Sequence, residues 1–174
     1  MTKLVSSLLL AAVCSTPALA APPAVSSFDA VVIRAADADT FVCDRDGHRA
    51  VKVRLFGVDA PEIKHRPREQ DQPGGQAALA YVAKAWVGKE VTITPKGESY
   101  GRVVAEVVDA KTGESLALDV VEHGHAWVDR RYTRAQPLVA AEQKAREEKR
   151  GLWAESSPVA PWDWRKQQRM RGRK

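Results

Sequence analysis

The sequence predicts an α+β fold, mainly β, in which five strands close a small barrel and three helices pack outside it. Runs rich in β-branched residues are separated by short turns, which is typical of a meander of strands. Three other segments repeat apolar residues at helical spacing, and each is followed by glycine. A length of 174 residues with 44% hydrophobic side chains suits one globular domain and argues against a disordered or collagen-like chain.

The first three strands are expected over residues 28–36, 39–44 and 50–56. Asp46-Gly47 lies between the second and the third, and this dipeptide is a strong signal for a two-residue hairpin turn. In the third strand, valine and leucine alternate with lysine and arginine, which predicts one face toward a core and one toward solvent. Tight turns between neighbours make the three strands a meander.

The rest of the domain alternates between strands and helices, after a polar loop that contains two prolines and two glycines. The glycine after each helical segment supplies its stop signal. No internal repeat interrupts this order. The expected elements are the loop at 66–75, a helix at 76–87, strands at 91–94 and 102–108, and helices at 116–123 and 137–150.

The first twenty residues have the features of a secretory signal peptide. Lys3 supplies the positive start, the apolar run over 4–14 is too short to span a bilayer, and the Ala-Leu-Ala triplet ending at Ala20 matches a cleavage site. We therefore predict a signal peptide at 1–20, a linker at 21–27, and a secreted or periplasmic mature protein without a membrane segment. A short uncleaved membrane anchor is the alternative.

Removal of this signal peptide leaves Cys43 as the single cysteine of the mature chain. One cysteine forms no intramolecular disulfide, so the domain must be stable through its hydrophobic core, which roughly 150 residues can supply. Cys43 lies in an apolar strand-like run. It is expected to be a small core residue rather than a reactive thiol.

The C-terminal segment 154–174 is basic and contains tryptophan and proline. It is predicted as a loosely held tail, in which Trp162 and Trp164 are the side chains able to pack back on the domain. Arg165–Lys174 holds six Lys or Arg residues, and without these six and Lys3 the net charge of +5 becomes −2. The tail either attracts phosphates or is a solvated charged segment. Nucleic-acid binding by the domain itself must come from the local placement of arginines.

Acidic residues stand where apolar strands end. Asp37 and Asp39 lie between the first two strands, and Asp59 and Glu62 follow the third. If these strands are neighbours in one sheet, the two acidic segments meet. Clustered carboxylates repel one another and favour a bound cation, and oxygen ligands without His or Cys suit Ca²⁺ or Mg²⁺ rather than zinc. The alternative is that these are ordinary turn and cap aspartates.

Two arginines add phosphate-binding groups to the same region. Arg54 lies on the polar face of the third strand, five residues before Asp59, and Arg102 follows Tyr100-Gly101 at the start of another strand. Each guanidinium can bind a phosphate with two hydrogen bonds and stays charged. Two arginines that face a cation site would clamp a phosphodiester and stabilise its charged transition state. Either arginine alone is more commonly the partner in a surface ion pair.

Taken together, these residues resemble the staphylococcal nuclease (thermonuclease-like) family. The three motifs of the family correspond to Asp37–Thr40, Arg54–Glu62 and Tyr100–Arg102, in the same order and separation, and Trp153 also matches. The second motif reads Arg-Leu-Phe-Gly-Val-Asp-Ala-Pro-Glu and is specific to the family. The resemblance covers residues 28–153, for which it implies an OB-fold barrel with three helices.

The resemblance also implies an activity, namely calcium-dependent hydrolysis of the phosphodiester bonds of DNA and RNA that leaves 3′-phosphate ends. The resemblance implies that calcium is bound directly by Asp39, Asp59 and the main-chain carbonyl of Ala60, with Asp37 at an outer position around the ion. Glu62 corresponds to the general base, and Arg54 and Arg102 correspond to the residues that bind the phosphate and stabilise its charge. Tyr100 and Tyr132 correspond to residues that line the nucleotide pocket.

Three positions depart from the family pattern. Ala38 replaces the usual glycine between the first two aspartates, which is costly if the backbone there needs a positive φ. Arg130 replaces a second tyrosine of the nucleotide pocket, so base stacking or nucleotide preference is expected to differ. Glu98 replaces an aspartate before the Tyr-Gly-Arg motif, which is a minor change.

Other basic residues and two histidines complete the list of candidates. Lys64, Arg66 and Arg68 form a basic loop beside the predicted site. The resemblance implies that this loop contacts nucleic acid, and a solvated loop is the alternative. His123 and His125 stand near a helix end and are predicted to be a cap and a packing residue rather than metal ligands.

The predicted function is therefore that of a secreted or periplasmic, calcium-dependent nuclease that acts on DNA and RNA, with a monomer as the expected state. The runner-up is a catalytically inactive OB-fold module that binds nucleic acid. A structural or partner-binding β-barrel that binds neither nucleic acid nor calcium is a third reading. The positions expected to carry chemistry all hold suitable side chains, which favours the enzyme.

Overall fold

The computed structural model describes residues 26–47, 49–64 and 70–172. The predicted signal peptide, the first residues of the predicted linker, and the loop arginines Arg66 and Arg68 lie outside the described residues. The predictions for those parts of the chain therefore stay predictions.

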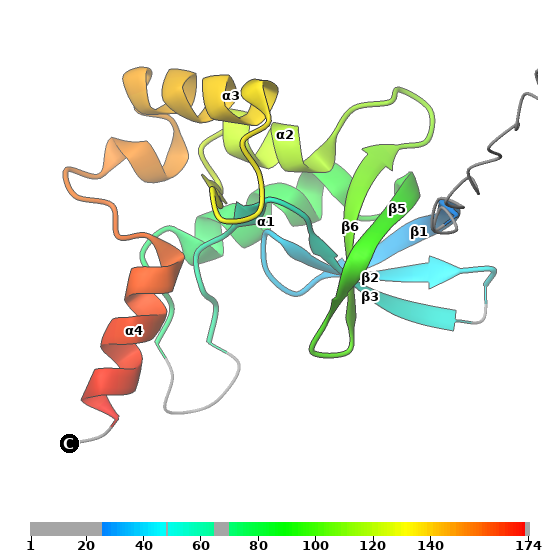
Figure 1. Ribbon diagram of the computed structural model, residues 1–174, viewed down its shortest axis with the longest axis horizontal. Coiled ribbons are helices and arrows are strands. Elements are labelled where there is room, and N and C mark those ends of the chain that lie inside the picture. The colour runs from blue at the N-terminus through cyan, green and yellow to red at the C-terminus, as the bar shows by residue number, and fades with distance from the viewer. Residues whose placement is uncertain (1–25, 48, 65–69, 173–174) are drawn as a thin grey trace, which may run out of the picture.

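Five strands close the predicted barrel. They are β1 (Phe28–Ala35), β2 (Thr40–Arg45), β3 (Arg49–Leu55), β5 (Glu90–Ser99) and β6 (Arg102–Asp109). Their order around the barrel is β1-β2-β3-β6-β5, and every neighbouring pair is antiparallel except β3 and β6, which are parallel. The barrel confirms the fold class expected from the strand pattern, and Figure 1 shows it at one end of the molecule.

The barrel interior is filled by the alternate side chains of its strands. Phe41, Leu55 and Ile93 are almost completely buried there, as period-2 alternation predicts. Cys43 is also buried with an exposed fraction of 1%. Burial raises the pKa of this thiol to about 12, so Cys43 is a core residue and carries no thiolate at neutral pH.

Two hairpin turns use the left-handed backbone that tight turns require. Asp46 and Gly47 have φ values of 65° and 72°, which confirms the predicted turn, although β2 and β3 are separated by three residues rather than two. Tyr100 and Gly101 join β5 to β6 with φ values of 51° and 72°. Ala38 is not among the positive-φ residues of the described chain, so the glycine that it replaces is not needed for that reason.

A second, two-stranded sheet was not predicted. It consists of β4 (Val58–Asp59) and β7 (Trp127–Val128), and Asp59 pairs with Trp127. Strands of two residues show no alternation, so their sequence carries no signal for them. This small sheet matters because it holds Asp59 next to a tryptophan on which the C-terminal part of the chain packs.

The three predicted helices are present and a fourth helix corrects the prediction of a loose tail. The helices are α1 (Gly75–Trp86), α2 (Leu116–Glu122), α3 (Gln136–Glu147) and α4 (Pro161–Arg171), with a 3-10 turn, η1, at Gly151–Ala154. Proline in the first turn and Asp163 near the N-terminus are helix-start signals in α4. Among the helices of the described chain, none has the length and apolar character that crossing a bilayer requires.

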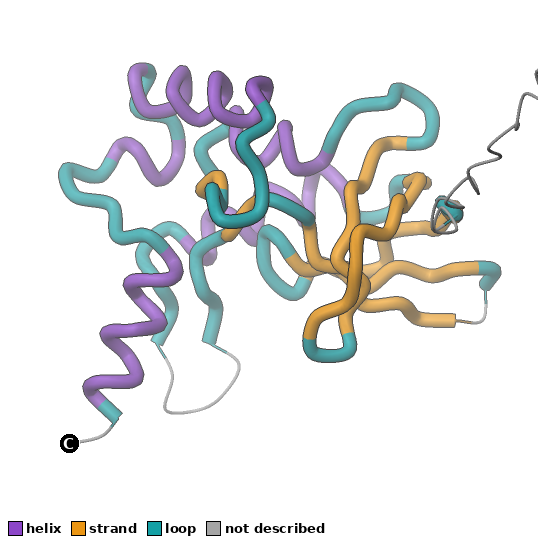
Figure 2. The backbone as a smooth tube through the Cα atoms, in the orientation of Figure 1, coloured by secondary structure: helices purple, strands orange, loops and turns teal. Residues whose placement is uncertain are grey.

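Figure 2 shows the helices gathered on the side of the molecule opposite the β1–β3 strands, with α4 at the far end. Trp153 in η1 packs edge-on against Trp127, with ring centroids 4.3 Å apart. The chain after α3 is thus folded back on the domain. The high charge and proline content of this segment are also typical of a solvated tail, and for that reason its sequence predicted a loosely held one.

His123 and His125 have structural roles, as predicted. His123 is the C-terminal cap of α2, and the ring of His125 lies 4.3 Å from that of Tyr81. The buried Asp119 accepts hydrogen bonds from Trp86 Nε1 at 2.6 Å and from Tyr81 Oη at 2.7 Å. This network joins α1 to α2 and satisfies the polar atoms it buries.

Candidate active site

The pairing of β2 with β3 brings Asp39 next to Arg54. Thr40 is the strand partner of Arg54, and the amide of Leu55 donates to the carbonyl of Asp39 at 2.8 Å. Arg54 Nη1 then donates to Asp39 Oδ1 at 2.5 Å. The Asp39 side chain is 2% exposed, so this carboxylate is buried against its cation.

The same guanidinium reaches the second acidic segment. Arg54 Nη2 donates to Asp59 Oδ1 at 2.9 Å, and the amide of Ala60 donates to Asp39 Oδ2 at 2.8 Å. Burial of Arg54 lowers its pKa, but the Asp39 and Asp59 carboxylates raise it by more, so its net pKa lies above the ordinary value. The two acidic segments therefore meet at one arginine, as the strand order led us to expect.

Asp37 lies behind this pair. Its Oδ1 accepts the amide N–H of Asp39 at 3.0 Å, which stabilises the turn between β1 and β2. Burial raises the pKa of Asp37 to about 8, and the neighbouring Asp39 carboxylate adds to the rise. In this arrangement Asp37 supports the conformation of Asp39.

Glu62 is held at the edge of the site by Gln72. The amide of Glu62 donates to Gln72 Oε1 at 3.1 Å, and the amide of Gln72 donates to the Glu62 carbonyl at 2.8 Å. A Cβ atom on Gly75 would lie 2.9 Å from the same carbonyl, so the start of α1 needs glycine there. The Glu62 side chain keeps an exposed fraction of 33% and is accessible from solvent.

A third arginine, which was not among the predicted site residues, enters the site from α4. Arg165 Nη2 donates to Asp59 Oδ2 at 2.6 Å, and its Nη1 donates to Asp59 Oδ1 at 3.1 Å and to Glu62 Oε1. The hydrogen bond to Asp59 is the main reason why the pKa of Arg165 is raised. The six basic residues of the tail were visible in the sequence, but nothing there distinguished this arginine from the other five.

The walls of the site form a cleft of about 760 Å³. Arg102 lines it and donates from Nη1 to Thr40 Oγ1 at 3.4 Å. Tyr100 and Tyr132 stand at its rim with exposed fractions of 96% and 67%. These exposed rings are free to contact a ligand that enters the cleft.

Two of the predicted substrate-binding residues do not line this cleft. Lys64 is exposed and its amide donates to Asp71 Oδ1 at 2.7 Å. Arg130 donates from Nη2 to Glu142 Oε2 at 2.9 Å and lines a neighbouring pocket. A contact between either side chain and a substrate at the carboxylates stays a prediction.

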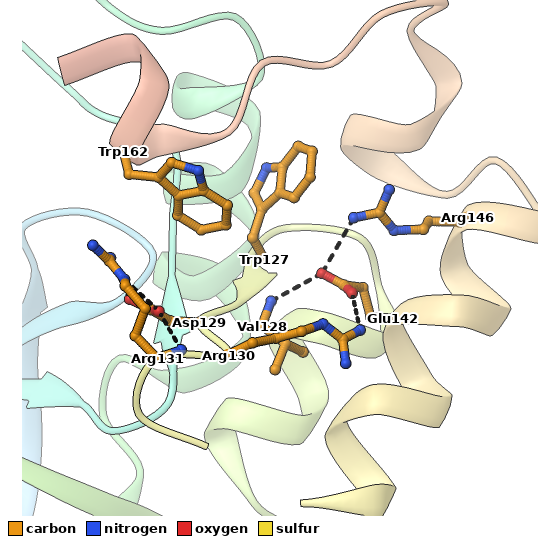
Figure 3. Close-up of a pocket in the computed structure, with 8 residues that line it drawn as sticks. All are labelled: Trp127, Val128, Asp129, Arg130, Arg131, Glu142, Arg146 and Trp162. Atoms are coloured by element: carbon orange, nitrogen blue, oxygen red, sulfur yellow. Dashed lines mark hydrogen bonds and ion pairs between the residues drawn. The ribbon is translucent and has the colours of Figure 1, made fainter. Parts of the chain in front are cut away.

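The neighbouring pocket has a volume of about 430 Å³, and its lining includes Trp127, Trp162 and Arg146 (Figure 3). Asp129 and Arg131 line both the pocket and the cleft, so the two hollows adjoin. Arg131 pairs with Asp129 through Nη2 at 2.6 Å and Nε at 2.8 Å. This ion pair is thus shared by the linings of the cleft and the pocket.

The donor chemistry of the cleft fits a hard divalent cation, although no group of three or more His, Cys, Asp or Glu side chains in the described chain is arranged to hold a metal ion. Asp39 and Asp59 are both nearly fully buried and both need a positive charge beside them. Their oxygens are at present paired with Arg54 and Arg165. A cation would therefore have to share Asp59 with, or take it from, an arginine.

The arrangement suits chemistry on a phosphodiester. Arg54 and Arg102 place positive charge along the cleft, and an accessible carboxylate, Glu62, stands at its edge. Guanidinium groups bind phosphate oxygens and stabilise the charge that develops on them during displacement. A carboxylate next to the phosphate can accept the proton of an attacking water.

Comparisons with known proteins agree with this chemistry. A family model described as staphylococcal nuclease homologue matches residues 52–155. An uncharacterized endonuclease of Escherichia coli is 36% identical over 135 residues, which cover 77% of this chain and 82% of that protein. An uncharacterized endonuclease of Haemophilus influenzae is 31% identical over 140 residues, covering 80% of this chain and 74% of that protein.

A plant protein is also similar to this chain. The staphylococcal-like nuclease CAN1 of Arabidopsis thaliana is 33% identical over 119 residues, which cover 68% of this chain but 34% of that longer protein. The residues matched by the family model include Arg54, Asp59, Glu62 and Arg102. The similarity thus extends over most of the cleft described above.

Proposed function

We propose that this chain, which belongs to the staphylococcal nuclease family and is a nuclease, is secreted and depends on calcium. In this proposal it hydrolyses phosphodiester bonds of both DNA and RNA and leaves 3′-phosphate ends. The observation that carries the proposal is the junction of Asp39 and Asp59 at Arg54, inside a cleft with Glu62 at its edge.

Calcium would be held by the carboxylates of Asp39 and Asp59 and by the main-chain carbonyl of Ala60. When bound, the ion supplies charge neutralisation and orientation of the substrate phosphate. Carboxylate and carbonyl oxygens are the ligands that calcium prefers. Asp37 would act indirectly, through its hydrogen bond to the amide of Asp39.

The side chains of the cleft would carry out the displacement at phosphorus. Glu62 orients a water molecule and accepts its proton while the water oxygen forms a bond to phosphorus. The bond from phosphorus to the 5′-oxygen breaks, this oxygen takes up a proton from solvent, and the phosphate stays on the 3′ side. Arg54 and Arg102 stabilise the negative charge on the non-bridging oxygens. Tyr100 and Tyr132 would contact the bases or sugars at the rim.

Digestion of labelled single-stranded DNA and RNA by the purified chain tests this proposal. We expect both substrates to be cut in Ca²⁺ and neither in excess chelator, with products that accept a 3′ label only after phosphatase treatment. Mg²⁺ in place of Ca²⁺ is the matched control, because it has the same charge but requires a more rigid coordination geometry. Binding of both substrates without cleavage in Ca²⁺ would instead favour an inactive OB-fold binding module.

Secretion is a separate part of the proposal and rests on residues 1–20. We expect the protein recovered from the periplasm or the medium to begin at Ala21, as measured by intact mass and N-terminal sequencing. Ala20→Glu should prevent cleavage, because signal peptidase requires a small residue there. Recovery of the protein with residues 1–20 still attached would contradict the assignment.

A further inference from the structure

Arg165 occupies both oxygens of Asp59 and one oxygen of Glu62. One of these carboxylates is a proposed calcium ligand and the other the proposed general base. A planar guanidinium that binds one carboxylate with two hydrogen bonds is among the strongest side-chain partners available in proteins. The positive charge at this point of the cleft is thus supplied by the chain itself, from a residue 106 positions after Asp59.

The position of Arg165 is set by contacts that do not involve its own charge. Gln72 Nε2 donates to the carbonyl of Val159 at 2.7 Å, just before α4 begins. Pro161 is buried, and Trp162 packs edge-on against Trp127 with ring centroids 5.8 Å apart (Figure 3). Trp127 is the strand partner of Asp59, so α4 is fastened beside Asp59 itself.

The side chain of Arg165 is more exposed than that of Asp59, which allows another cation to replace the arginine. The side chain of Arg165 is 34% exposed, whereas that of Asp59 is 1% exposed. Arg165 can turn toward solvent on its long side chain while the helix stays docked, and Asp59 cannot leave the cleft. Because a guanidinium stays protonated throughout the working pH range, Arg165 does not release the carboxylates by losing its proton, and a competing cation can take them when the side chain turns away.

We infer that Arg165 is a resident cation that competes with the divalent ion for Asp59, and that it thereby determines the metal affinity of the site. The inference rests on the proposed function. The apparent dissociation constant of a ligand equals its intrinsic value divided by the fraction of molecules in which the site is open, so a contact that is formed in about nine of ten molecules weakens calcium binding about tenfold.

Calorimetric titration of calcium into the full chain tests the inference without reference to cleavage. We expect Arg165→Gln to bind Ca²⁺ about tenfold more tightly than the unchanged protein. Arg165→Lys should have an intermediate affinity, because lysine keeps the positive charge but cannot donate two parallel hydrogen bonds to one carboxylate. Lys166→Gln is the matched control, since Lys166 follows Arg165 on α4, is exposed and is not among the residues that line the cleft. Its affinity should stay unchanged. The calcium-induced rise in melting temperature should follow the same order.

Each outcome decides the question. Equal affinities of Arg165→Gln and Lys166→Gln overturn the inference and leave the calcium-dependent nuclease intact, whereas no calcium binding to any variant overturns both. A loss of cleavage in Arg165→Gln at saturating calcium, with unchanged affinity, shows that Arg165 contacts substrate and also overturns the inference. If Arg165→Gln does not fold, Trp162→Ala serves instead, because loosening the start of α4 should likewise tighten calcium binding.

Discussion

Glu62→Gln is expected to lower the rate of DNA and RNA cleavage about a thousandfold, which lies in the range for loss of a general base. Glutamine keeps the size of the side chain and its hydrogen-bonding capacity but cannot accept a proton from water at neutral pH. The backbone of Glu62 is held by Gln72, so the substitution should leave the fold unchanged. Initial rates at saturating Ca²⁺ measure the effect.

Binding of nucleic acid must be preserved in the same variant. Fluorescence anisotropy with a labelled oligonucleotide should give a dissociation constant within about twofold of the unchanged protein, since the phosphate-binding arginines remain. Glu155→Gln is the matched control, because Glu155 is exposed and follows η1, outside the residues that line the cleft. Cleavage by Glu62→Gln at the rate of this control would rule out Glu62 as the base.

Arg54→Ala is expected to have the largest effect on stability. It lowers the free energy of unfolding in chelator by about 3 kcal/mol, because removal of one partner leaves a buried charge without compensation. Asp39 and Asp59 are 2% and 1% exposed, and both accept from this one guanidinium. Cleavage should fall by at least about a hundredfold as well, since the same group is expected to stabilise the transition state. Urea unfolding followed by tryptophan fluorescence, in chelator and in Ca²⁺, measures the stability change.

Two comparisons make the prediction specific. Arg54→Lys should recover part of the stability but little of the cleavage, because one ammonium group cannot bridge both carboxylates. Arg34→Ala, on the exposed part of β1, should change stability by less than about 0.5 kcal/mol. Calcium should restore part of the stability of Arg54→Ala by supplying a cation to the same carboxylates. An Arg54→Ala variant as stable in chelator as Arg34→Ala would refute the electrostatic account of the site.

Much of the architecture could be predicted because its signals are local. Alternation of valine with charged residues in β3, the Asp46-Gly47 turn and the glycines after α1, α2 and α3 each act within a few residues of chain. Such signals indicate element type without knowledge of the partners. The sheet of β4 and β7 escaped prediction for the opposite reason, since its strands exist only through pairing with each other.

The same distinction applies to the site. The residue types of Asp39, Arg54 and Asp59 predicted a cation and phosphate site, because chemistry restricts which side chains bind such groups, and the order of the motifs carried the resemblance that implied a nuclease. The place of Arg165 could not be read in this way. Six basic residues near the C-terminus are equivalent in sequence, and the packing of Trp162 on Trp127 selects the one whose guanidinium meets Asp59. Long-range packing, and not local preference, makes that choice.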